Sequence, residues 1–163
     1  MRDAARSAVY AVEDAWSRVL DRGGQVDFFG SRLDIPVQRR FGDLGAMQAY
    51  ADHWLRQAAA AGRVAGPVRI RPRKGARMAH YEPAGVVAIP IEAGWACTEA
   101  VLLHELAHHV VSALPEPGAV AEPHGPGYRG TMCWLVELAI GPQAALMLRT
   151  GYQGAGLGVR HVA

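Results

Sequence analysis

Apolar positions recur with two different spacings along the first third of the chain, and each spacing predicts a different element. Residues 4–20 carry apolar side chains at intervals of three and four, which predicts a helix. Apolar and polar residues then alternate over residues 25–36, on both sides of Gly30-Ser31, which predicts a short hairpin. A second helix is expected over residues 43–61, with Asp43 as its cap.

Strands are expected in the middle of the chain. Residues 68–71 alternate with a period of two, and residues 76–81 and 86–89 have a similar strand-like composition. Glycines and a proline between these segments, at Lys74-Gly75 and over residues 83–85, are typical of turns. The three segments therefore predict a small sheet.

The last third again predicts helices. Thr98 can cap a helix that runs to Ala113 and stops before a loop rich in proline and glycine over residues 115–127. Another helix is expected over residues 128–140, followed by a short one that ends at Arg149.

This order of elements predicts an α+β fold, with helices packed on a small, mainly antiparallel sheet. No linker divides the chain, so we expect one domain over residues 1–150 and a glycine-rich tail over residues 151–163. A length of 163 residues suits one such domain.

Composition and charge exclude several classes of protein. Half of the residues are apolar and 20% are charged, as in globular rather than disordered proteins, and a net charge of +2 does not by itself indicate nucleic-acid binding. We expect no membrane span, because no apolar run is long enough, and no export signal is visible in residues 1–10. Cys97 and Cys133 are too few for a zinc ribbon and are expected to be reduced, buried thiols, which favours a cytoplasmic location.

The helix expected after Thr98 carries the sequence His104-Glu105-Leu106-Ala107-His108. Two histidines four residues apart lie about 40° apart on one helix face, so both imidazoles can bind one metal ion. Glu105 lies on a different side and is placed to act on a water bound to that ion rather than as a third ligand. These residues form the HExxH pattern of zinc hydrolases.

The same pentapeptide also occurs by chance on helices whose polar residues merely face solvent. Here the other faces of the helix are apolar, so the polar residues are expected to be buried. Burial of unpaired polar groups is costly, so these residues are expected to have a function. The apolar positions are Leu102, Leu103, Leu106, Val110 and Val111.

Sequence spacing alone leaves several candidates for the third metal ligand. A metzincin needs a glycine and a histidine where this chain has Val111 and Leu114, so that subclass is excluded. Glu137 is one alternative, although a salt-bridged carboxylate is the preferred interpretation of that residue, and a site completed by solvent is another. His124 is the better candidate, because it lies in a loop that returns toward the helix that carries HExxH.

The residues 104–109 and 124–129 together resemble the HExxH…HGxxF pattern of SprT-like zinc metallopeptidases, with Tyr128 at the position of the family's aromatic residue. The chain is also similar to a family of small bacterial metallohydrolases, with further likeness at residues 28–31, 79–82, Trp95 and Gly141-Pro142. The resemblance implies a zincin-like fold and a zinc ion held by His104, His108 and His124.

The expected function is therefore that of a zinc-dependent hydrolase, with Glu105 as general base and a peptide or protein as substrate. Two alternatives remain open: a DNA-associated repair protease of the SprT-like type, and a catalytically silent binding module that the metal stabilises. The chain lacks the zinc ribbon that often accompanies the DNA-associated type, which argues against DNA binding.

Several other residues carry weaker predictions. His109 is expected to be a core histidine, and His80 or Tyr81, on a strand that precedes the HExxH helix, can stabilise an oxyanion. One strand face carries a basic cluster, which is more typical of a solvated surface than of a nucleic-acid site, because no aromatic residues interleave with it. The cluster comprises Arg69, Arg71, Arg73, Lys74 and Arg77.

Overall fold

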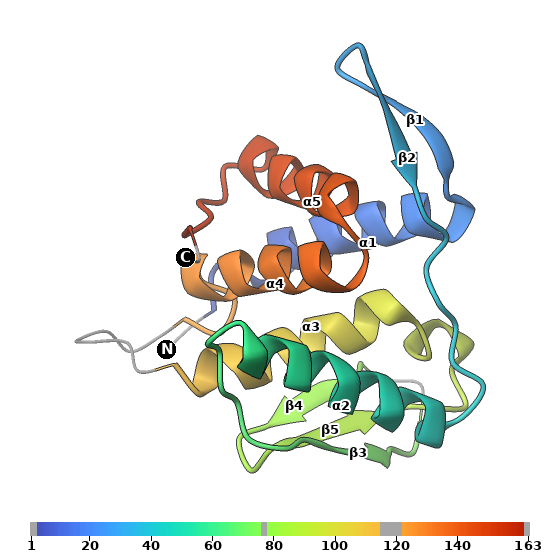
Figure 1. The fold of residues 1–163 in the computed structure, drawn as a ribbon, viewed down its shortest axis with the longest axis vertical. Helices are drawn as coiled ribbons and strands as arrows, with labels where there is room; N and C mark the ends of the chain where they lie inside the picture. Colours follow the sequence, from blue (N-terminus) through green and yellow to red (C-terminus); the bar gives the residue numbers. More distant parts are fainter. Residues whose placement is uncertain (1–2, 76–77, 115–121, 162–163) are drawn as a thin grey trace. The chain divides into compact units, whose positions relative to one another are not determined.

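A computed structural model describes residues 3–75, 78–114 and 122–161 of the chain. Its class is α+β, with helices, a two-stranded sheet and a three-stranded sheet. The residues form two compact units, one from residues 1–38 and 119–163 and the other from residues 39–118 (Figure 1). We call them the terminal unit and the central unit.

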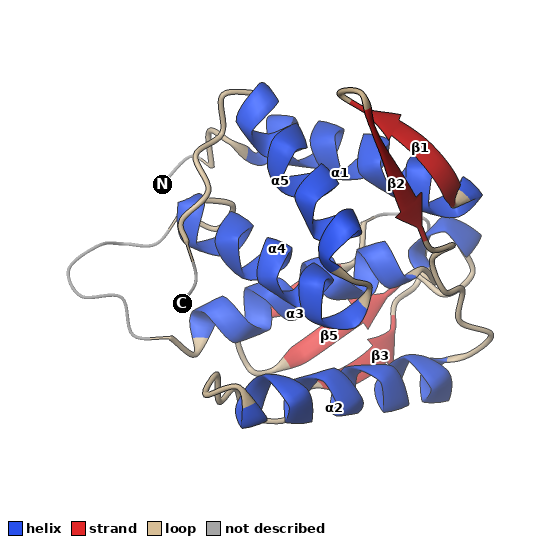
Figure 2. Cartoon of the chain, turned by 45° about the horizontal axis from the view of Figure 1, so that its top comes forward, coloured by secondary structure: helices blue, strands red, loops and turns tan. Residues whose placement is uncertain are grey.

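The central unit contains a mixed sheet with two helices against it. Its strands have the order β3-β5-β4, in which β5 pairs parallel to β3 and antiparallel to β4. Helix α2 packs against β3, α3 packs against β4, and the two helices also contact each other, beside the strands in Figure 2. The elements are α2 (Leu44–Ala60), β3 (Arg69–Pro72), β4 (His80–Glu82), β5 (Val86–Ile89), a short 3-10 helix (Gly94–Ala96) and α3 (Glu99–Ser112).

The sheet of the central unit presents one apolar face to its helices. Ile70 and Tyr81 both pair with Val87, so these three side chains lie in one row on the same face. All four residues of β5 are buried, as expected for a central strand. Helix α2 begins as predicted, because an Asp43 carboxylate oxygen accepts a hydrogen bond from the amide of Ala46 at 2.8 Å.

The terminal unit contains three helices and a hairpin. Helix α5 packs against both α1 and α4, and β1 pairs antiparallel with β2. The hairpin turns through Phe29 and Gly30, whose φ angles are 51° and 80°, as in a type I′ turn. The elements are α1 (Arg6–Arg22), β1 (Gly24–Phe28), β2 (Ser31–Ile35), α4 (Pro126–Ala139) and α5 (Pro142–Gly154).

The structure corrects several details of the sequence-based prediction. The three-stranded sheet contains a parallel pair where a mainly antiparallel sheet was predicted, because alternation along a strand does not specify its partner. Strand β4 begins at His80 rather than at residue 76, and residues 76–77 lie outside the described residues. Thr98 does occupy the cap position of α3, but its hydroxyl donates to the carbonyl of Trp95 instead of capping the helix.

The last helix is longer than predicted. Helix α5 continues to Gly154 instead of ending at Arg149, because Tyr152 is fully buried and so holds the final turn against the core. After the helix, the amide of Leu157 bonds to the carbonyl of Tyr152 at 2.9 Å and that of Arg160 to the carbonyl of Pro126 at 3.1 Å. Much of the expected tail is therefore ordered. None of the helices in the described part of the chain has the length and apolar character that a bilayer crossing requires.

Candidate functional site

Helix α3 places the HExxH residues inside the central unit. Its apolar residues Leu102, Leu103 and Leu106 are fully buried, which fixes the helix against the sheet and α2. Its first residue, Glu99, accepts hydrogen bonds from the hydroxyl of Tyr50 at 2.6 Å and from the amide of Arg39 at 2.9 Å. A carboxylate in the first turn also complements the helix dipole. The helix start is thus anchored by polar contacts and its length by apolar packing.

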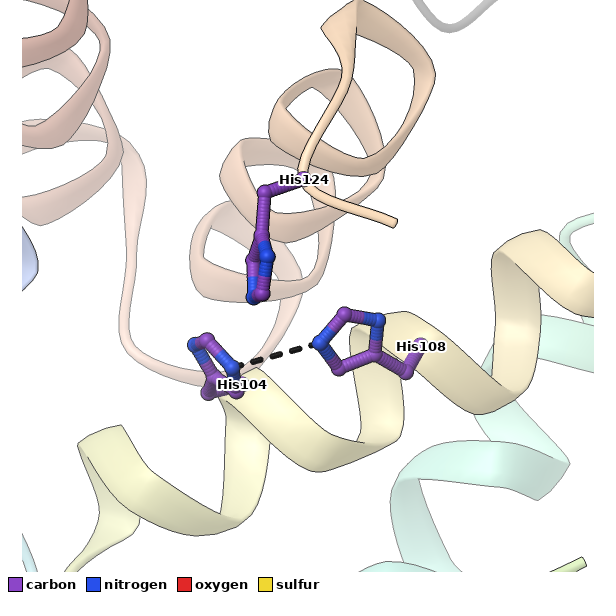
Figure 3. Close-up of side chains that lie close together, drawn as sticks. All are labelled: His104, His108 and His124. Atoms are coloured by element: carbon purple, nitrogen blue, oxygen red, sulfur yellow. Dashed lines mark hydrogen bonds between the residues drawn. The ribbon is translucent and has the colours of Figure 1, made fainter. Parts of the chain in front are cut away.

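The two histidines of α3 converge on one point. Figure 3 shows both rings projecting from the same side of the helix, and their Nε2 atoms lie 3.3 Å apart. Zinc–nitrogen bonds of about 2.0–2.1 Å at a tetrahedral angle place two ligand nitrogens about 3.3–3.4 Å apart. Two imidazole lone pairs repel at this distance unless a proton or a cation lies between them. The donor set of His104 and His108 therefore fits a tetrahedral metal ion.

Burial of the neighbouring carboxylate is consistent with a reactive site. Glu105 is only 4% exposed and His104 is 5% exposed. Burial of a carboxylate costs several kcal/mol of folding free energy unless a neighbouring charge or hydrogen bonds offset it. A buried carboxylate and a buried imidazole therefore stand next to each other among the apolar residues of α3.

His124 lies in the terminal unit, on the segment that leads into α4, where Figure 3 labels it. The residue is 5% exposed, and its ring packs against those of Tyr10 and Tyr128, with centroid distances of 5.3 and 5.0 Å. Its Nδ1 atom is 2.5 Å from a carboxylate oxygen of Asp3. A metal would therefore be bound through Nε2.

The other candidate for the third ligand has a different environment. Glu137 lies on α4 with its side chain exposed, whereas His124 is buried. Exposure is the usual environment of a helix carboxylate, and the salt bridge expected for Glu137 stays a prediction. Glu137 also serves as a matched control for Glu105 in the experiment below.

His109 is a buried histidine with structural bonds, as expected. Its Nε2 lies 2.6 Å from the carbonyl of Gly66 and its Nδ1 lies 3.2 Å from the hydroxyl of Tyr81. A carbonyl only accepts, so Nε2 carries the proton and Nδ1 accepts from Tyr81. His109 thereby ties α3 to β4 and to the segment before β3.

His80, which with Tyr81 was a candidate for stabilising an oxyanion, belongs to a charged network on the outer face of the sheet. Arg73 donates to Nδ1 of His80 at 2.8 Å, so Nε2 carries the proton and donates to Glu82 at 3.1 Å. Arg71 also pairs with Glu82, and its hydrogen bond holds the pKa of that carboxyl below its usual range. An oxyanion role for His80 or Tyr81 stays a prediction, since both hydrogen-bond within the central unit.

The same network supports the interpretation of the basic cluster as a solvated surface. Two of its arginines, Arg71 and Arg73, are engaged by residues of β4 and by the carbonyls of Pro72 and Met78. Arg69 and Lys74 are exposed, and Arg77 lies outside the described residues. The face is therefore a partly neutralised, solvated strand surface, as the sequence indicated.

Both cysteines are free thiols, as predicted, but Cys97 is only half-buried where burial of both was expected. Cys133 is fully buried, and this burial raises its pKa to about 12. A thiol with so high a pKa is protonated at neutral pH and is therefore a poor nucleophile.

Asp3 is the residue of this site that sequence analysis missed. It lies 121 positions from His124, and a single aspartate near one end of a chain has no pattern that would reveal such a contact. Comparisons with models of known protein families, with curated proteins and with solved structures gave no match to this chain.

Proposed function

We propose that the protein is a zinc-dependent hydrolase, most directly a peptidase, in which His104, His108 and His124 hold the metal and Glu105 is the general base. The observation that carries the proposal is the 3.3 Å separation of the two Nε2 atoms on α3, next to a buried glutamate. The three histidines also have the donor atoms that a single metal ion requires. The resemblance of residues 104–109 and 124–129 to the HExxH…HGxxF pattern also supports the proposal of a SprT-like metallopeptidase.

The residues divide the chemistry among them. A zinc ion held by His104, His108 and His124 would supply a Lewis acid and would lower the pKa of a bound water molecule to about 7. Glu105 accepts the proton of the attacking water on one carboxylate oxygen and later delivers it to the leaving amine. The three histidines would hold the metal as neutral imidazoles, since a protonated imidazole cannot act as a ligand.

A peptide is the preferred substrate because of the edge of the sheet. Strand β4 lies at one end of the order β3-β5-β4 and packs against the helix that carries Glu105. An extended peptide can add to such an edge through main-chain hydrogen bonds. The short length of β4, residues His80–Glu82, would limit this pairing to a few residues of substrate.

The direct test replaces Glu105 by glutamine, which keeps the shape of the side chain and removes its basicity. We expect the E105Q variant to retain zinc while hydrolysis of a fluorescently labelled unfolded protein falls by about 100-fold or more. The matched control is E137Q, the same change at an exposed position of α4, which should leave both zinc and activity at the parent level.

Measurements on E105Q and on the parent also separate this proposal from the alternatives. Full activity of E105Q would contradict the role of Glu105, and absence of activity in the zinc-loaded parent would favour the catalytically silent binding module. Stimulation of the parent by DNA, lost at higher salt, would instead favour the DNA-associated protease.

A further inference from the structure

Asp3 holds the ring of His124 from a segment outside the motif. Its Oδ2 atom is 2.5 Å from Nδ1 of the imidazole, and the side chains are only 16% and 6% exposed. A carboxylate accepts and does not donate, so the proton of the ring lies on Nδ1. The lone pair is then on Nε2, the tautomer that a ligand histidine needs.

The backbone of His124 is fixed as well. Its carbonyl accepts a hydrogen bond from Nη1 of Arg129 at 2.5 Å, and Nε of the same arginine donates to the carbonyl of Gly158 at 2.7 Å. Segments near both ends of the described chain thus meet at one histidine. With ring and backbone both restrained, the direction of Nε2 is set within the terminal unit.

The Asp3 carboxylate is a costly way to stabilise a fold. Among the described residues, its second oxygen, Oδ1, is buried and has no hydrogen-bond partner. Buried polar groups of this kind are rare in folded proteins and call for an explanation. Apolar residues of similar volume often serve stability at least as well as a buried carboxylate bonded to an imidazole, so the orientation of the imidazole is the better explanation.

We propose that Asp3 is a positioning residue for the metal: it fixes the tautomer and orientation of His124 and makes Nε2 a stronger donor. Ligand histidines commonly donate their second nitrogen to a carboxylate, and loss of that partner weakens metal binding by about 10–100-fold. This inference rests on the proposed function, because it assigns a role to Asp3 only if His124 is a ligand.

The test compares zinc affinities of the full chain by competition with a chromophoric chelator. We expect D3A to bind zinc about 10–100-fold more weakly than the parent. D3N should recover part of this loss, because its amide oxygen still accepts from Nδ1 without carrying a charge. The control is D14N, which removes the same charge from an exposed position of α1 and should bind zinc like the parent.

A second readout separates positioning from a merely structural role. Cobalt bound in place of zinc reports on its ligands through its visible absorption, which should change in D3A and coincide with the parent in D14N. Affinity of D3A within about twofold of the parent would overturn the inference, as would a weaker D3A with an unchanged cobalt spectrum. If the parent itself binds neither metal, the proposed function fails instead.

Discussion

Phe29 combines a strained backbone with an exposed side chain. It is 86% exposed, and its φ of 51° lies in the left-handed region that bulky residues avoid. The first position of a type I′ turn favours asparagine. We expect F29N to raise the free energy of unfolding by about 1 kcal/mol, because the relief of this strain outweighs the loss of the exposed ring's contact with Phe28.

Denaturant unfolding of F29N beside the parent measures this effect. V64N is the control, since Val64 is also exposed, at 71%, but has no positive φ, and its free energy of unfolding should stay near that of the parent. A less stable F29N would mean that the edge-on contact with Phe28, at 4.9 Å between ring centroids, outweighs the backbone strain.

Single residues also show where sequence information was sufficient at the candidate site. His104, Glu105 and His108 follow from spacing on one helix, which is a local property of the chain. Asp3 does not, because its partner lies 121 positions away and its meaning depends on the folded structure.

Among the helices, α1 and α5 pack closely enough to require a glycine. A Cβ atom at Gly151 would lie 2.9 Å from Cγ1 of Val12, whereas one at Gly154 would meet nothing within 4 Å. Alanine favours a helix over glycine by about 1 kcal/mol, but the clash falls on a β-branched side chain that cannot rotate away freely.

We therefore expect opposite signs from two similar substitutions in α5. G151A should lower the melting temperature, since overpacking costs about 1–3 kcal/mol and exceeds the gain in propensity. G154A should raise it slightly or leave it unchanged, because the position is open and lies at the end of the helix. Equal shifts in the two variants would contradict the packing of α1 against α5.

The same elements show which parts of the fold the sequence could predict. Helices α1 and α2 and the β1–β2 hairpin were predicted from periodicity and turn residues, since these signals are local. The parallel pairing of β3 with β5 and the extension of α5 to Gly154 were not, because they depend on contacts between distant segments. Tyr152, which holds the end of α5, gives no sign of its burial in a glycine-rich stretch.

At the scale of the whole molecule, three buried groups among the described residues make stability sensitive to alkaline pH. Burial and the nearby Glu99 raise the pKa of Tyr50, burial and Glu13 raise that of Tyr152, and burial raises that of Cys133 to about 12. In the unfolded chain these groups lose their protons near their ordinary values, about 8.5 for cysteine and about 10 for tyrosine. The unfolded state therefore binds fewer protons than the folded state above those values.

We expect the free energy of unfolding to be unaffected by these groups below about pH 8.5 and to fall as the pH rises toward 12. Urea unfolding between pH 8 and pH 10.5 measures this decrease. The Y50F variant should lose stability less steeply than the parent, because it removes one of the three groups. A free energy that stays constant over this range would contradict the burial of these residues.

The central claim, that the protein carries a zinc ion on three histidines, is tested most directly by elemental analysis of metal per chain. The comparison is between the parent, H124A and the control H53A, which replaces an exposed histidine of α2. We expect one zinc per chain in the parent and in H53A, and far less in H124A. Zinc retained in H124A would contradict the assignment of the third ligand, and a parent without metal would contradict the hydrolase itself.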